Sequence, residues 1–319
     1  MADATEMSAR STGAAPPGAL RRVFDSDIFY SFRHSPVTVV AALITLLGFI
    51  GAICAPWLAT QNPFDLRTLS LMDANLPPSW IEGGEAKYLF GTDNQGRDVF
   101  STILYGSRVS LLVGVGSVLL ALVLGVGLGL LSGYAGGSID AFIMRVADVQ
   151  LSFPAILIAL LIDGITRAIL PRDAHDAAAV YVLILSIGAS GWVQYARTVR
   201  GTTLVERNKE YVQAARVTGV APLRIMVRHV LPNVLGPVLV LATIQVATAI
   251  ITEATLSFLG VGVPPTSPSL GTLIRVGNDY LFSGEWWIII FPGLMLVLIA
   301  LSVNLLGDWL RDALNPRLR

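Results

Sequence analysis

The sequence predicts an all-α membrane protein with six transmembrane helices, and two observations lead to this fold class. Hydrophobic residues make up 54% of the 319-residue chain and charged residues only 14%, which is unlike an ordinary soluble domain. Uncharged apolar stretches also recur along the chain at about 20 residues, the length that crosses roughly 30 Å of hydrocarbon. The formal net charge of +0 gives no support to a nucleic-acid partner, and we expect none.

Five apolar stretches are long enough to span a bilayer without a charged residue: 37–58, 109–131, 177–196, 230–252 and 286–307. A sixth stretch, 149–162, is short, and it becomes long enough if its helix begins near Asp140. Arg145 and Asp148 would then lie three residues apart on one helix face, where they can pair. The first span is followed by a loop, 59–108, and the other five spans form a core over 109–307.

The positions of Lys and Arg predict the orientation of these spans. With the N-terminus inside, the inner segments carry 15 Lys and Arg residues and the outer segments carry seven, as the positive-inside rule requires. We therefore expect two cytoplasmic tails, 1–36 and 308–319, and an external loop at 59–108. In the first tail, Phe24, Ile28, Phe29 and Phe32 are spaced as in an amphipathic helix that lies at the membrane interface.

A polar and basic segment, 197–232, lies between two of the spans and is cytoplasmic in this topology. Residues 204–218 favour a helix, and one face of it carries mostly small side chains that let another protein approach closely; this face contains Tyr211, Ala214, Ala215 and Thr218. The alternative is a basic loop that only satisfies the positive-inside rule.

A turn predicted at Gly219 divides this segment into two helices. Glycine readily adopts the left-handed conformation that ends a helix. Pro222 suits the first turn of the second helix, where its missing N–H is not needed. Pro232 follows near the start of the next span. The result is a helix–turn–helix elbow, which we expect to dock on another protein.

The spacing of Gln213-Ala214-Ala215, Gly219 and Leu231-Pro232 resembles the EAA coupling loop of ABC importer permeases. Four further parts of the chain resemble the C-type permease subunit of dipeptide and oligopeptide ABC importers, so that the resemblance covers most of the chain after about residue 20. These parts are 91–98 with 105–111, 133–148, 253–264 and 307–316. Two positions depart from the family pattern: Gln213 stands where the family has an acidic residue, and Leu270 where it often has Trp.

The resemblance implies a permease subunit in the bacterial inner membrane. Its expected partners are a second homologous permease, two cytoplasmic ATPase subunits, an extracytoplasmic substrate-binding protein and the lipid bilayer. ATP and Mg are expected on the ATPase subunits, and this chain is expected to bind no cofactor. Peptides are the expected cargo, with nickel, glutathione or another small solute as alternatives. The residues implied in ATPase coupling are Glu210, Gln213, Ala214, Ala215, Gly219, Pro222, Leu231 and Pro232.

Polar residues near the expected outer surface form a second candidate site. Asp93, Arg97 and Asp98 precede the second span, and Glu253 ends the fifth. They are candidates for an outer gate or for contact with the binding protein. The alternative for the first three is turn chemistry with a helix cap at Asp98. The alternative for Glu253 is a place among the lipid headgroups.

No catalytic or metal site is expected in this chain. Neither Lys87 nor Lys209 stands in the Gly-Lys-Ser/Thr context of a P-loop, so ATP-driven transport would need a separate ATPase chain. The three histidines are far apart, and the one cysteine, Cys54, lies in an apolar run. A secondary transporter or channel is a second reading, for which ionisable or unwound sites near the midplane would be expected. A third is an intramembrane enzyme or assembly factor.

Overall fold

The computed structural model describes residues 27–65, 69–264 and 267–313, and over these ranges it contains helices and no β-strand. The main helices are α2 (Asp27–His34), α3 (Pro36–Ile53), α4 (Ala55–Leu58), α5 (Val99–Ala135), α6 (Gly137–Leu151), α7 (Ala155–Ile169), α8 (Arg172–Glu206), α9 (Glu210–Val217), α10 (Pro222–Ile225), α11 (Leu231–Phe258), α12 (Leu270–Tyr280) and α13 (Trp287–Ala313).

Five helical stretches are long and apolar enough to cross a membrane: α3, α5, α8, α13 and the continuous helix Pro222–Phe258 that contains α10 and α11. The pair α6 and α7 makes a sixth if it is counted as one broken span. The all-α membrane fold expected from composition is therefore confirmed. Of the predicted interfacial helix, residues 27–34 form α2, where Phe32 packs edge-on against Trp309 of α13 at 5.2 Å; Phe24 lies outside the described residues.

The short predicted span at 149–162, which is the third in chain order, is bent and not straight. Its two halves, α6 and α7, meet at 94° across a break of three residues that ends in Pro154. Proline has no N–H for the helical hydrogen bond, and its ring clashes with the preceding turn, so a helix stops at this position. The expected pair of Arg145 and Asp148 is also absent, because Asp148 binds Arg197 of α8 with an N–O distance of 2.5 Å.

The longest helix, α5, begins earlier than the apolar stretch it contains. Asp98 caps it, since its carboxylate accepts a hydrogen bond of 3.0 Å from the backbone N–H of Ser101. The helix then runs for 37 residues and packs along α8, which has 35. Glycines allow the close approach of the two: a Cβ on Gly129 would lie 2.4 Å from the carbonyl oxygen of Ala196.

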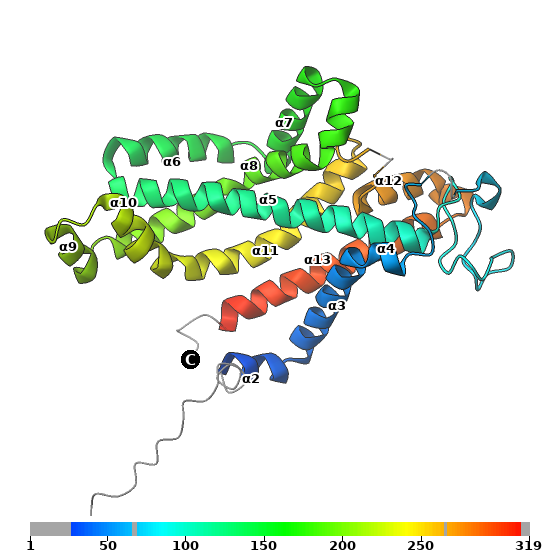
Figure 1. Cartoon of the computed structure of the whole chain (residues 1–319), viewed down its shortest axis with the longest axis horizontal. Coiled ribbons are helices and arrows are strands. Elements are labelled where there is room, and N and C mark those ends of the chain that lie inside the picture. The colour runs from blue at the N-terminus through cyan, green and yellow to red at the C-terminus, as the bar shows by residue number, and fades with distance from the viewer. Residues whose placement is uncertain (1–26, 66–68, 265–266, 314–319) are drawn as a thin grey trace, which may run out of the picture.

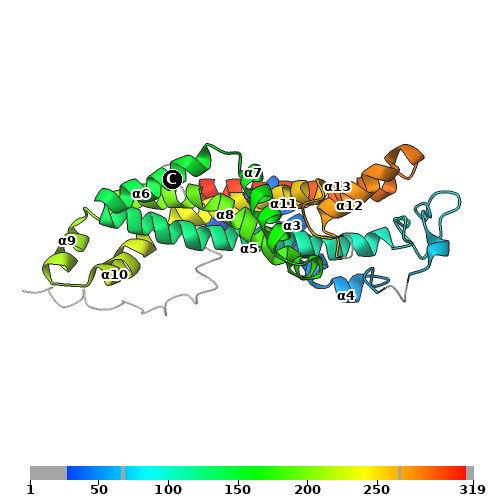
Figure 2. The same ribbon diagram turned by 90° about the horizontal axis from the view of Figure 1, so that it is seen from above.

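The molecule is elongated, and α5 runs along most of its length (Figure 1). The elbow formed by α9 and α10 lies at one end, while α12 and the loop between α4 and α5 lie at the other (Figures 1 and 2). On one side of α5, α7 stands out from the body (Figure 1). On the opposite side, α3 packs against α13. This arrangement separates an elbow end from a loop end across the membrane-spanning body.

Candidate functional site

The elbow begins where α8 ends at Glu206, and α9 closes with a complete Schellman motif. Gly219 has a φ of 77°, the left-handed conformation predicted for it. The N–H of Val220 bonds to the carbonyl of Ala215, and that of Gly219 to the carbonyl of Arg216, both at 3.0 Å. Pro222 then occupies the first turn of α10, as predicted. The turn is therefore specified by its own backbone hydrogen bonds.

The second arm of the elbow continues directly into the membrane. A π-helical segment, Met226–Val230, joins α10 to α11, and the N–H of Leu231 bonds to the carbonyl of Met226 five residues earlier. Residues Pro222–Phe258 thus form one helical stretch of 37 residues. Pro232, which lacks an N–H, lies just after the π-helical segment. No loop therefore separates the second arm of the elbow from α11.

The elbow has a buried face and an exposed face. Val212, Ala215, Ile225 and Val230 point inward and join the core formed by the long helices. The exposed residues include Glu210, Gln213, Ala214, Arg216, Gly219, Pro222 and Pro232, and Leu231 is half-buried. Ala215, placed on the docking face by the sequence, therefore faces the body instead. Two apolar side chains that the sequence reasoning missed are exposed beside the turn: Val217 at 88% and Leu223 at 70%.

Tyr211 also turns toward the body and connects the elbow to two spans. Its hydroxyl donates a hydrogen bond of 2.6 Å to Glu206 at the end of α8. The same oxygen accepts a bond of 3.0 Å from the side-chain amide of Asn233 in the first turn of α11. Burial, together with the bond to Glu206, raises the pKa of Tyr211 to about 12, so the hydroxyl remains a donor at neutral pH.

The elbow is further attached to the end of α5. Arg207 donates a hydrogen bond of 2.8 Å to the carbonyl of Gly133. The guanidinium of Arg216 lies over the ring of Tyr134, 4.9 Å from its centroid. These contacts, with those of Tyr211, hold the elbow against α5, α8 and α11 at once.

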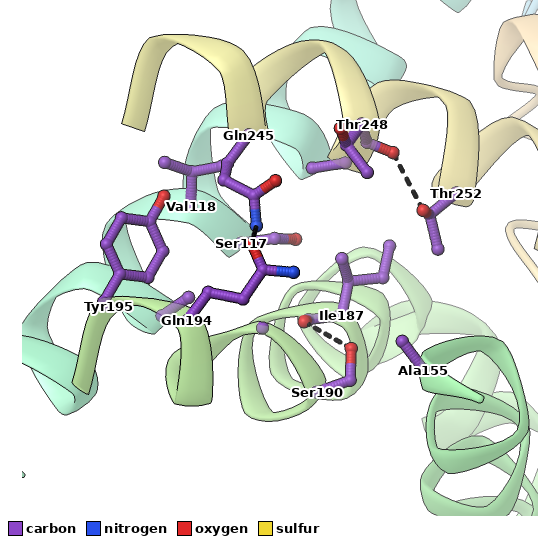
Figure 3. Close-up of a pocket in the computed structure, with 13 residues that line it drawn as sticks. Ser117, Val118, Ala155, Ile187, Ser190, Gln194, Tyr195, Gln245, Thr248 and Thr252 are labelled. Carbon is purple, nitrogen blue, oxygen red and sulfur yellow. Dashed lines mark hydrogen bonds between the residues drawn. The ribbon is translucent and has the colours of Figure 1, made fainter. Parts of the chain in front are cut away.

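A cavity opens between α5, α8 and α11 in the middle of the body, with Ala155 of α7 at its edge (Figure 3). It encloses about 100 Å³, and the residues that line it carry no charge. The side-chain amides of Gln194 and Gln245 point toward each other across it and form a hydrogen bond of 2.9 Å (Figure 3). Ser190, Thr248 and Thr252 add hydroxyl groups to the same surface.

This cavity is not predicted from the sequence, although two polar residues give a local signal for it. Gln194 is at the end of one predicted span and Gln245 is within another, and both are polar residues in apolar surroundings. Polar side chains in a membrane helix usually face protein or water. The sequence does not reveal that the two amides lie opposite each other, because the two residues are 51 positions apart in the chain and belong to different helices.

The three candidate residues before α5, Asp93, Arg97 and Asp98, are buried, and their polar groups are bound within the protein. Arg97 forms an ion pair with Asp93 at 2.6 Å, and the other oxygen of Asp93 accepts the N–H groups of Gln95 and Arg97. Asp98 accepts hydrogen bonds from Thr60 and Ser101. The geometry is that of a tight turn followed by a helix cap, the alternative given above.

Glu253 is fully buried near the end of α11 and joins three helices. One carboxylate oxygen accepts a bond of 2.6 Å from Ser110 of α5, and the other accepts one of 2.7 Å from Ser257. The hydroxyl of Ser110 also accepts the N–H of Leu270, the first residue of α12. This carboxyl therefore lies inside protein and not among lipid headgroups.

Residues 125–319 match the family described as the binding-protein-dependent transport system inner membrane component. The match includes the elbow, the whole of α8 and α11, and most of the residues that line the central cavity. The chain belongs to this family. Such a protein is a multi-pass component of the bacterial inner membrane, in agreement with the five or six apolar helical spans.

Three similar proteins extend the likeness over nearly the whole length of this permease-family chain. The di/tripeptide transport system permease protein DppC of Pseudomonas aeruginosa is 38% identical over 92% of both chains. The dipeptide transport system permease protein DppC of Haemophilus influenzae is 36% identical over 92% of this chain and 95% of its own. The oligopeptide transport system permease protein OppC of Bacillus subtilis is 36% identical over 92% of this chain and 90% of its own.

Proposed function

We propose that this chain is a permease subunit of an ABC importer for short peptides. With a second homologous permease it forms the translocation pathway, two separate cytoplasmic ATPase subunits bind ATP and Mg²⁺, and an extracytoplasmic protein delivers the cargo. The observation that carries this proposal is the elbow, whose exposed turn is presented at one end of the molecule while its second arm is continuous with α11.

The proposed mechanism follows from the attachment of the elbow. ATP binding and hydrolysis move the ATPase subunits, on which the exposed residues between Glu210 and Leu223 dock. Since α10 runs into α11 without a loop, a shift of the elbow tilts α11 and changes the wall of the central cavity that this helix provides. The cavity thereby becomes accessible from one side of the membrane and then from the other.

Peptide cargo is supported by the three similar proteins, which are named as peptide transport permeases, and by the chemistry of the central cavity. The amide groups of Gln194 and Gln245 each offer a donor and an acceptor, which are the groups that a peptide backbone requires. The cavity lining also contains no carboxylate, imidazole or thiol group that could ligate a metal ion. These properties favour a peptide over nickel, because nickel sites in proteins typically use ligands such as imidazole.

The orientation is part of the proposal. The segments assigned to the cytoplasm, which include the elbow, carry 15 of the 22 Lys and Arg residues of the sequence. The loop before α5, together with α12, then faces the outside and the binding protein.

Uptake of labelled di- and oligopeptides tests the proposal in cells that lack this chain and receive the wild type, Gly219→Val or Gly219→Asn. Valine is strained at a φ of 77°, whereas asparagine tolerates this conformation; no atom lies within 4 Å of an added Cβ, so the backbone alone causes the difference. We expect uptake with the wild type and with Gly219→Asn, and its loss with Gly219→Val at normal membrane levels.

Two results would count against the proposal in different ways. Uptake at the wild-type rate by Gly219→Val contradicts the role of the elbow. Failure of the wild type itself to restore peptide uptake contradicts the peptide cargo, and nickel and glutathione would then be measured in the same cells.

A further inference from the structure

A second cavity lies on the α12 side of the molecule, away from the elbow, between α7, the start of α8 and α12. It has a volume of about 390 Å³, which is within the range of sites for small ligands. Unlike the central cavity it is lined by charged side chains of both signs, Arg167, Asp176, Arg275 and Asp279. The elbow and the central cavity do not use it.

Two glycines after α11 shape one wall of this cavity. Gly260 has a φ of 82°, and a Cβ at this position would lie 2.4 Å from Nη1 of Arg275. A Cβ on Gly262 would lie 2.1 Å from the hydroxyl oxygen of Ser257. Only glycine therefore lets the backbone fold tightly here and the guanidinium of Arg275 lie directly against it. The segment Gly260-Val261-Gly262 thus lets the chain turn tightly at this cavity wall, far from the elbow.

Two of the four charges are already engaged by neighbours. Arg167 forms an ion pair of 2.6 Å with the buried Asp163, and Asp176 lies 3.8 Å from the ring of His175. Arg275 and Asp279 differ: across the part of the chain that the structure describes, neither has an ion-pair partner within 4.0 Å. They lie one turn apart on α12 and both line the cavity, yet they do not pair with each other.

This spacing suits a molecule with a positive and a negative end. Side chains four residues apart on a helix have their Cβ atoms about 5–6 Å apart. An extended chain of two residues spans at most about 7 Å, and its ends carry an ammonium and a carboxylate group. Arg275 can bind a carboxylate through two parallel hydrogen bonds, and Asp279 can accept those of an ammonium group.

We propose that the cavity between α7 and α12 is an entry subsite for short peptides with free termini, in which Arg275 binds the carboxylate and Asp279 binds the ammonium group. This inference rests on the proposed function and adds the chemical feature by which the permease itself recognises the cargo.

Two helices connect this entry subsite to the central cavity. Ala155 of α7 lies at the central cavity and Arg167 of the same helix at the entry subsite. Along the other helix, α11, Thr252 lines the central cavity and Gly260, just beyond the helix end, lines the entry subsite. Eight residues of helix correspond to about 12 Å. The twelve residues from Ala155 to Arg167 correspond to about 18 Å, so the two cavities are separated by about 12–18 Å along these helices.

Protection of a cysteine in the cavity measures binding without the binding protein. The complete transporter, in proteoliposomes, carries Cys54→Ser with Val276→Cys, which places the thiol in the cavity wall. Phe282→Cys is the control, because this side chain is 97% exposed and does not line the cavity. The probes are dialanine, its C-terminal amide and its N-acetyl derivative, and the rate of maleimide labelling is measured.

We expect dialanine to slow labelling at position 276 and not at 282, and the two blocked peptides to protect far less. Adding Arg275→Gln or Asp279→Asn should raise the dialanine concentration needed for protection by about tenfold or more, as expected for the loss of at least one hydrogen bond to a charged group. Arg108→Gln and Asp308→Asn, which change exposed charges that do not line the cavity, should not raise it. Equal protection by free and blocked peptides, or none, overturns the proposal.

Transport separates this subsite from a surface that binds the delivery protein. At saturating binding protein, Arg275→Gln and Asp279→Asn should lower the maximal rate of dialanine uptake. If they raise only the concentration of binding protein needed for half-maximal uptake, the charges contact that protein and the subsite is overturned. Should the wild type not transport dialanine at all, it is the proposed function that fails first.

Discussion

Tyr211 is one residue on which three helices of the elbow region depend. Its ring belongs to α9, its hydroxyl donates to Glu206 of α8, and the same oxygen accepts from Asn233 of α11. A hydroxyl group that is both a donor and an acceptor holds two spans at a defined angle to the elbow. Phenylalanine keeps the ring and removes both bonds, so this position separates packing from hydrogen bonding.

We predict that Tyr211→Phe uncouples transport from ATP hydrolysis. Each lost hydrogen bond costs about 0.5–1.5 kcal/mol, and α9 is then no longer tied by this hydroxyl to Glu206 of α8 and Asn233 of α11, so that less of its movement reaches the spans. Peptide uptake per ATP hydrolysed, measured in proteoliposomes with the partner subunits, should fall several-fold. The matched control is Tyr181→Phe, whose side chain is 74% exposed on α8. An unchanged ratio for Tyr211→Phe would show that the hydroxyl does not contribute to coupling.

At the scale of elements, two ion pairs join α6 to α8, and they differ in exposure. Arg200 binds both oxygens of Asp140, at 2.5 and 2.7 Å, and Ser132 of α5 donates to the same carboxylate. This pair is partly buried, since the side chain of Arg200 is 34% exposed and that of Asp140 is 18% exposed. The pair of Arg197 and Asp148 has a single bond, and its side chains are 48% and 57% exposed.

We predict that Asp140→Asn destabilises the permease more than Asp148→Asn does. A bidentate, charge-assisted pair is worth about 1.5–3 kcal/mol per hydrogen bond to a charged group, whereas an exposed pair contributes about 0.2–1 kcal/mol. Thermal unfolding of the purified transporter should therefore show a clearly lower melting temperature for Asp140→Asn and little change for Asp148→Asn. Equal shifts would mean that burial and the second hydrogen bond add nothing at Asp140.

At the scale of the whole molecule, the spans expose more large apolar side chains than the surface of a soluble protein normally does. Examples are Val123 at 67% and Leu161 at 62% exposure. Lipid and a second permease are the surroundings that would cover these surfaces. The charged and polar ends of the body then define two aqueous faces, and their orientation is open to direct measurement.

We predict opposite labelling of two single cysteines placed on a Cys54→Ser background. Lys87→Cys is exposed in the loop before α5, and Asn208→Cys is exposed between α8 and α9. A maleimide that cannot cross membranes should label position 87 in intact spheroplasts and position 208 only after the membrane is permeabilised. Labelling of position 208 in intact spheroplasts would reverse the assigned topology.

The sequence by itself determined those features that depend on local properties of the chain. Apolar length predicted the spans, because the thickness of the bilayer sets it. Gly219 predicted the turn and Asp98 the start of α5, because a positive φ and a helix cap involve only a few neighbouring residues. Pro154 carried the signal for a broken third span, although the apolar pattern favoured a continuous one.

Only the tertiary structure decided which of these local features meet. Ala215 and Tyr211 turn toward the body because the core side of α9 is set by α8 and α11, not by α9 alone. Glu253 is satisfied by Ser110, which lies 143 positions earlier in the chain. The central cavity and the entry subsite likewise combine residues from several helices. A periodic pattern specifies a face of a helix, and only packing specifies what that face will touch.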